Sequence, residues 1–186
     1  MNKRGSILEK PAVFKVKQKT VSIIGLGNSF MGDDALGPYI IEYLRENYET
    51  MVKPVAEPLN INIKLMDASQ DPILAGAVIA EGNPVILIDA AEMNLPPGEY
   101  RLLKIPDIRK NIDLRAVSTH GFNIVQVLDM ADEFGYSEFV KILAVQLGSI
   151  HYGDAISKNV LINLNKIIKE ILKEVREINE KENTYS

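Results

Sequence analysis

Two adjacent carboxylates, Asp33 and Asp34, stand at the end of a glycine-rich loop, just before an expected helix. The loop follows a short apolar run that ends at Ile24, and it contains Gly25 and Gly27. Glycine lets another group approach the backbone closely, and acidic side chains are favoured beside the positive end of a helix. This pattern indicates a binding site, although a turn that leads into a capped helix uses the same residue types.

Three further groups able to bind a metal ion or move a proton come later in the chain. Asp67 and Asp89 each end an expected strand, and His120 lies in a loop before an expected helix. In a doubly wound α/β sheet the functional crevice lies beyond the carboxyl ends of the strands. We therefore expect Asp34, Asp89 and His120 to meet there. Their oxygen and imidazole ligands suit a first-row ion such as nickel or zinc, and the residues do not choose between the two.

Each of these side chains also has a purely structural interpretation. An aspartate before a helix commonly acts as its N-cap, which stabilises the helix by about 0.5–2 kcal/mol, and this role is favoured for Asp33. Asp34 could share that role, Asp89 could cap the loop after its strand, and Asp67 could hydrogen-bond within its own loop. The second histidine, His151, follows a strand and is expected to be structural or to line the rim.

The elements that must position these groups alternate between strands and helices. We expect strands at 21–24, 61–67, 84–89, 99–103 and 140–147, helices at 35–48, 72–81, 123–134 and through 160–178, and a connection at 51–60. The charged side chains of the last helix are expected to be solvated. The continuous apolar run at 84–89 indicates cover on both faces, as in a parallel sheet. We predict an α/β fold, a three-layer αβα sandwich with a mostly parallel twisted sheet and one antiparallel edge strand at 99–103.

The composition fits one compact domain. Of the 186 residues 46% are hydrophobic, so we expect residues 20–182 to form a single α/β domain after a basic N-terminal arm at 1–19. The net charge of −4 gives no reason to expect a nucleic-acid partner, and no apolar run is long enough for membrane insertion. Cysteine is absent, which excludes disulfides, thiolate metal sites and cysteine nucleophiles. We therefore expect a cytoplasmic protein.

Several common catalytic signatures are missing from the sequence. The dinucleotide-binding fingerprint needs a third glycine where this chain has Phe30, so a nucleotide site is disfavoured. The chain has no Gly-x-Ser-x-Gly elbow, no His-Glu-x-x-His helix and no phosphate-binding loop that ends in Lys-Ser or Lys-Thr. Two carboxylates and one imidazole remain as the candidate chemistry.

Three short motifs then occur in the order found in one family of peptidases. They are Gly25-x-Gly27-Asn28 with Asp33, Asp34 and Gly37, then Leu87-Ile88-Asp89-Ala90, then Ser118-x-His120. Together they resemble the hydrogenase maturation proteases, which remove a C-terminal peptide from the large-subunit precursor of nickel-iron hydrogenases after nickel is inserted. The resemblance implies that the 20–182 domain is a peptidase domain.

The resemblance also implies roles for individual residues. Asp34, Asp89 and His120 would bind a metal ion that stands in for the nickel of the substrate. Our own hypothesis is that water attacks with carboxylate assistance from Asp34 or Asp89, so both are candidate catalytic residues. A supporting loop set would consist of Gly25, Gly27, Asn28, Asp33, Gly37 and Asp67. The nickel would arrive inside the precursor, so the isolated protein, expected to be a monomer, would be metal-free or hold a substitute divalent ion.

Two departures from the family pattern bear on the substrate subtype. The chain has Asp67-Ala68-Ser69-Gln70 where many members have a Gly-Gly-Thr-like stretch, and Gly121 stands where Gln or Glu is common. These differences fit the archaeal-type branch or the branch that serves deazaflavin-reducing hydrogenases. The sequence leaves two points open. An aspartate could activate water or the metal could polarise the carbonyl, and the same triad could belong to a nickel-dependent binding module that does not cleave.

Overall fold

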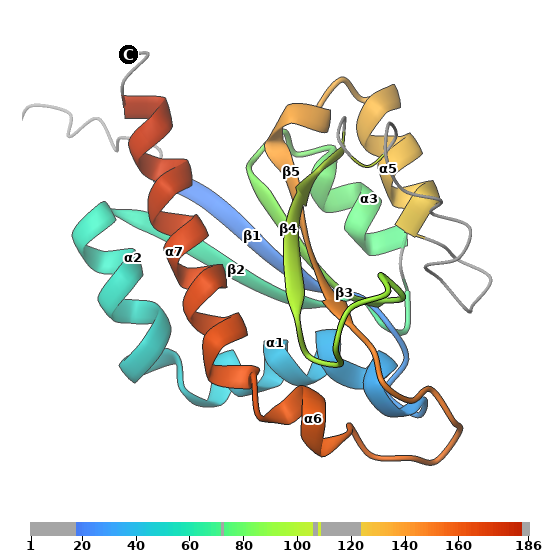
Figure 1. The fold of residues 1–186 in the computed structure, drawn as a ribbon. Helices are drawn as coiled ribbons and strands as arrows, with labels where there is room; N and C mark the ends of the chain where they lie inside the picture. The colour runs from blue at the N-terminus through green and yellow to red at the C-terminus, as the bar shows by residue number, and fades with distance from the viewer. Residues whose placement is uncertain (1–17, 72, 106–107, 109–123, 184–186) are drawn as a thin grey trace, which may run out of the picture.

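A five-stranded sheet forms the centre of the computed structural model, which describes residues 18–71, 73–105, 108 and 124–183 (Figure 1). The strands are β1 (Lys19–Gly25), β2 (Ile61–Asp67), β3 (Val85–Ala91), β4 (Tyr100–Lys104) and β5 (Val140–Gln146). They lie in the order β2-β1-β3-β5-β4. β4 is antiparallel to β5 at one edge, and the other neighbouring strands are parallel. The predicted sheet, including its antiparallel edge strand, is confirmed.

Helices cover both faces of this sheet. They are α1 (Leu36–Glu46), α2 (Lys53–Leu59), α3 (Ile73–Ile79), α5 (Ile124–Glu133), α6 (Lys158–Leu161) and α7 (Leu164–Asn183), with short 3₁₀ turns at Gly32–Ala35 and Ser137–Phe139 and a π turn at Tyr48–Val52. α1, α2 and α7 lie on one side of the sheet, and α3 and α5 lie on the other (Figure 1). This arrangement confirms the three-layer sandwich.

The apolar run of β3 supplies both cores of the protein. Ile86 and Ile88 pack in the core beneath α1, α2 and α7. Leu87, between them, packs in the opposite core with α3 and α5. Successive side chains of a strand point to opposite faces, so a strand covered on both sides needs apolar residues at every position. Their burial fixes the strand that ends near Asp89.

Residues 51–60 differ from the expected connection. The structure places a π turn and α2 there, so that prediction was wrong. Pro54 lies in the first turn of α2, where its missing N–H has no intrahelical partner to lose. Val55 and Ala56 are buried in the core, and Asn60 ends the helix with a φ of 51°. Burial therefore outweighs the helix-breaking tendency of the prolines, and this packing could not be read from local sequence.

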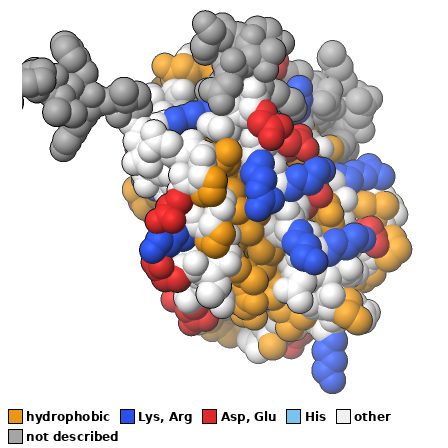
Figure 2. Space-filling view, turned by 90° about the vertical axis from the view of Figure 1, so that its left-hand side faces the viewer, with side chains coloured by type: hydrophobic (Ala, Val, Ile, Leu, Met, Phe, Trp, Pro, Cys, Tyr) orange, Lys and Arg blue, Asp and Glu red, His pale blue; other side chains and the backbone are white. Residues whose placement is uncertain are grey.

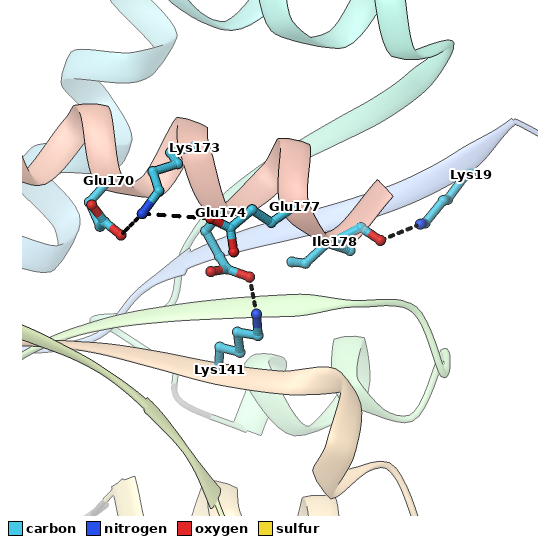
Figure 3. Close-up of polar contacts among 7 residues, drawn as sticks. All are labelled: Lys19, Lys141, Glu170, Lys173, Glu174, Glu177 and Ile178. Carbon is cyan, nitrogen blue, oxygen red and sulfur yellow. Dashed lines mark hydrogen bonds and ion pairs between the residues drawn. The ribbon is translucent and has the colours of Figure 1, made fainter. Parts of the chain in front are cut away.

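One charged residue of α7 is not solvated as expected. Glu174 is 2% exposed and forms an ion pair with Lys141 of β5, which points toward it from the sheet (Figure 3). Lys173, by contrast, pairs with Glu170 and Glu177 on the outer face of α7, where such pairs contribute little. This ion pair thus joins α7 to β5.

The face of the molecule that carries α2 shows no large patch of one charge sign. Figure 2 shows a band of hydrophobic side chains there, bordered by both basic and acidic groups. In the part of the chain that the structure describes, no helix combines the length and apolarity needed to cross a bilayer.

β1 begins at Lys19, the last residue of the expected basic arm, and the Lys19 ammonium donates to the carbonyl of Ile178 at 3.3 Å (Figure 3).

Candidate active site

The loop after β1 closes tightly around the backbone of Asp34. The Asn28 N–H donates to the Asp34 carbonyl at 3.1 Å, and the Asp34 N–H donates to the Met31 carbonyl at 3.1 Å. Gly27 has a φ of 117°, and a Cβ at this position would lie 2.0 Å from the Asp34 carbonyl oxygen. No larger residue fits that space, so the glycine is required for the loop to reach Asp34.

A second close approach joins α1 to the ends of two strands. A Cβ on Gly37 would lie 2.0 Å from the carbonyl oxygen of Leu26 and 2.9 Å from that of Ile88. The Leu26 N–H donates to the Ile88 carbonyl at 2.9 Å, which ties the loop to β3 immediately before Asp89. The first turn of α1 therefore lies against the carboxyl ends of β1 and β3. Asp34 lies just before this turn, and Asp89 directly follows Ile88 in β3.

The structure brings Asp34 and Asp89 together in a buried place. Their exposed fractions are 9% and 7%. Burial raises the pKa of the Asp89 carboxyl well above its ordinary value, and the nearby charge of Asp34 raises it further. A hydrogen bond from the backbone of Ala90 opposes the rise. Asp89 therefore keeps its proton at a pH where an ordinary aspartate is ionised, and once ionised it is a stronger base.

Asp33 does not cap the helix that follows it. The turn at Gly32–Ala35 has Met31 at its N-cap position and no side-chain capping bond. The Asp33 carboxylate is buried and accepts hydrogen bonds from Gly148, Ser149 and Ser157, in the loop after β5. The favoured capping interpretation was wrong, because a loop more than a hundred residues away competes for this side chain and leaves no local signal.

Asp67 lies on the same edge of the sheet, but its side chain hydrogen-bonds within its own loop. It ends β2 beside Gly25 of β1, and its Oδ1 accepts from the Ser69 N–H at 2.8 Å. Its side chain is exposed. The loop-bonding interpretation is confirmed, and this hydrogen bond shapes the start of the connection to α3.

The third predicted ligand, His120, lies outside the described residues. Among the residues that the structure does describe, no group of three or more His, Cys, Asp or Glu side chains is placed to hold a metal ion. His151 is exposed in the loop between β5 and α6, in keeping with a position on the rim. The structure thus places Asp34 and Asp89 near each other, and their role as metal ligands stays a prediction.

The loop between β5 and α6 lies against the loop after β1, a contact that the sequence did not reveal. Tyr152 on this loop stacks on Phe30 of the loop after β1, with ring centroids 6.4 Å apart, and both rings are exposed. The Gly153 N–H donates to the Phe30 carbonyl at 2.8 Å. The one available signal was its position after a buried parallel strand, where functional loops of α/β sheets lie.

Comparisons with known proteins identify the family of the chain. The family model of hydrogenase maturation proteases matches residues 38–174. A relative from Methanocaldococcus jannaschii is 26% identical over 163 residues, which are 86% of this chain and 90% of that protein. The hydrogenase 3 maturation protease of Escherichia coli is 29% identical over 113 residues, 60% of this chain and 64% of that protein.

Solved structures show the same fold. The crystal structure of the nickel-iron hydrogenase maturation protease HycI of Thermococcus kodakarensis superposes with a TM-score of 0.62 at 22% identity. The superposition covers 87% of this chain and 95% of that chain. At this identity the likeness concerns the arrangement of strands and helices.

Proposed function

Since the chain belongs to the hydrogenase maturation protease family, we propose that it removes the C-terminal extension of a nickel-iron hydrogenase large-subunit precursor after nickel insertion. The observation that supports this most directly is the buried pair of Asp34 and Asp89, two interacting carboxylates at the carboxyl edge of the sheet. Such an edge is where α/β folds place their reactive groups. The pair offers both ligand oxygens and a base.

Nickel enters this proposal as part of the substrate. Asp34, Asp89 and His120 would bind the ion already held by the precursor, which would dock the cleavage point and reject a nickel-free chain. Carboxylate and imidazole are suitable ligands for nickel, and the chain has no cysteine to bind it on its own. The isolated enzyme would then be metal-free or hold a substitute divalent ion.

Hydrolysis would use water activated by a carboxylate. The raised pKa of Asp89 makes its ionised form a stronger base than an ordinary aspartate. Asp89 would take a proton from water as the water oxygen attacks the carbonyl carbon, and would then give that proton to the leaving nitrogen as the C–N bond breaks. A carboxylate has two oxygens, so one can face the ion while the other faces the water.

A mass measurement tests the function directly. Pure protein is incubated with nickel-loaded and with nickel-free precursor, and the mass of the large subunit is followed. Loss of a C-terminal peptide from the nickel-loaded precursor alone is the expected result. Full cleavage by the Asp34→Ala protein would overturn the proposed role of Asp34, and a stable complex of unchanged mass would show a non-cleaving binding module.

The setting of the reaction follows from the same proposal. We expect the enzyme to act as a cytoplasmic monomer on the precursor, without nucleic acid and without membrane insertion. Light scattering of the purified protein checks the monomer, and a dimeric mass would contradict it. The subtype departures at Asp67 to Gln70 and at Gly121 would be tested by offering precursors of different hydrogenase groups.

A further inference from the structure

The buried carboxylate of Asp33 joins two loops that are remote in sequence. Its Oδ2 accepts from the N–H of Gly148 at 2.6 Å, the N–H of Ser149 at 2.9 Å and the hydroxyl of Ser157 at 3.0 Å. Its Oδ1 accepts from the N–H of Ser157 at 2.6 Å. Asp33 itself is 1% exposed. A carboxylate has about four acceptor positions, so these donors use its whole capacity.

Backbone hydrogen bonds run alongside this carboxylate. The Asp33 N–H donates to the Ser149 carbonyl at 2.8 Å, and the Gly32 N–H donates to the Asp154 carbonyl at 3.2 Å. A Cβ on Gly32 would lie 2.7 Å from the Ser149 carbonyl oxygen, so the two loops lie in direct backbone contact there. The loop after β5 therefore supports the end of the loop after β1 at Gly32 and Asp33.

This support reaches Asp34 through the chain. Asp34 directly follows Asp33, and its N–H and carbonyl are held by Met31 and Asn28 on the other side. The backbone of Asp34 is thus held by its own loop on one side and by the Asp33 contacts on the other. A rigid backbone limits where its carboxylate can lie relative to Asp89, and catalytic groups lose efficiency when displaced by about 1 Å.

We propose that Asp33 is a positioning residue, which holds the Asp34 carboxylate beside Asp89 by fastening the loop after β1 to the loop after β5. The proposal rests on the proposed function where it concerns cleavage. Its structural part, that the Asp33 carboxylate holds the backbone of Asp34, is independent of the substrate. Asp33 does not touch the reacting atoms in this account.

Asp33→Asn is the sharpest variant, because it keeps the shape and removes one acceptor oxygen. In the better orientation the amide oxygen replaces Oδ2 and keeps three donors, but the NH₂ group then faces the N–H of Ser157. Asp71→Asn is the matched control. Asp71 is exposed, and its side chain accepts a hydrogen bond from the Ile73 N–H at 3.1 Å, which an amide oxygen can accept equally.

The test combines cleavage kinetics with amide hydrogen exchange measured by NMR. We expect Asp33→Asn to lower kcat about 10- to 100-fold, with KM within about threefold of the unchanged enzyme. We expect faster exchange of the Ser157 and Asp34 amides, with the core amide of Ile86 unchanged. Asp71→Asn should leave all of these values as they are. An unaltered kcat, or faster exchange at Ser157 without any change at Asp34, would overturn the proposal.

The proposal can still be tested if the unchanged protein does not cleave the precursor or if Asp33→Asn does not fold. If the unchanged protein cleaves no precursor, the proposed function fails, and exchange at Asp34 still decides whether Asp33 holds it. If Asp33→Asn does not fold, Ser157→Ala is read in the same exchange assay, because it removes one donor to Asp33. Faster exchange at Asp34 then supports the proposal, and unchanged exchange overturns it.

Discussion

Two buried acidic places in this protein are built in opposite ways. At the interface of β5 and α7, Glu174 is paired with Lys141, so its charge is compensated. At the carboxyl edge of the sheet, Asp89 is buried beside another carboxylate, and its pKa rises. The first arrangement helps a helix pack on the sheet. The second disfavours the ionised form of Asp89 and so lowers the stability of the folded protein when Asp89 is ionised. The ion-paired acid belongs to the scaffold, whereas the two neighbouring carboxylates lie where we place the chemistry.

The largest expected effect comes from removing the base. Asp89→Asn keeps the shape of the side chain but cannot take a proton, so we expect kcat to fall about 10²- to 10⁴-fold. The measurement is the initial rate of peptide release from nickel-loaded precursor, with Asp71→Asn as the control for the chemical change. A rate within twofold of the unchanged enzyme would remove Asp89 from the mechanism.

The second effect concerns the compensated pair. Lys141→Met leaves Glu174 buried without its cation, and breaking a buried ion pair in this way destabilises a protein by about 3–5 kcal/mol. Urea unfolding followed by circular dichroism measures the change. Lys173→Met, on the outer face of α7, is the control and should change little. Replacing Lys141 and Glu174 together by apolar residues should restore most of the stability, and a double variant as weak as the single one would contradict this account.

The third effect is a gain in stability, rather than a loss, and it depends on pH. The pKa of Asp89 is higher in the folded than in the unfolded state, so the folded protein binds more protons between the two values. The contribution of this group to stability therefore falls as pH rises from the ordinary pKa toward the raised one. Asp89→Asn removes that loss, and we expect a higher Tm at neutral pH, where about 1 kcal/mol corresponds to about 2–4 °C.

The difference in Tm between Asp89→Asn and the unchanged protein should shrink toward zero as the pH is lowered through the ordinary aspartate range. Other titrating groups occur in both proteins and cancel in this difference. Differential scanning calorimetry at several pH values provides the comparison. A variant that is less stable at neutral pH and gains relative stability on acidification would show that the Asp89 carboxylate is compensated after all.

The smallest effect tests a third kind of buried acid. Asp33 is satisfied by neutral donors, and Ser157→Ala removes its hydroxyl partner while leaving the N–H bonds. We expect a loss of about 0.5–1.5 kcal/mol, as for a typical single hydrogen bond. Thermal unfolding measures this loss. No loss of stability would show that the hydroxyl bond is dispensable.

Much of the fold follows from local patterns. The strands at Ile61–Asp67 and Val140–Gln146 have the alternating or continuous apolar runs that their burial requires. The edge strand Tyr100–Lys104 follows a Pro-Pro-Gly turn and was predicted antiparallel. α2 was missed, because local rules weigh its prolines more heavily than the burial of Val55 and Ala56. Burial against another element has no local signature.

Part of the candidate site could likewise be predicted from the sequence, and part could not. The order of strands and the rule for parallel sheets place Asp34 and Asp89 on one edge, and the structure shows that their charges interact. The partners of Asp33 were beyond sequence reasoning, since residues 115 to 124 positions away supply them. The role of Asp34 with Asp89 and His120 stays a prediction until the variants are measured.

Local patterns in the chain predict which residues form strands, which loops face the carboxyl edge, and that oxygen and imidazole groups are the available metal ligands. These properties depend on side-chain type and on spacing within a few residues. The folded chain was needed to show that Asp33 joins two loops, that Glu174 pairs with Lys141, and that the pKa of Asp89 is raised. Hydrogen bonding, ion pairing and desolvation act through space, and their partners are set by the folded chain.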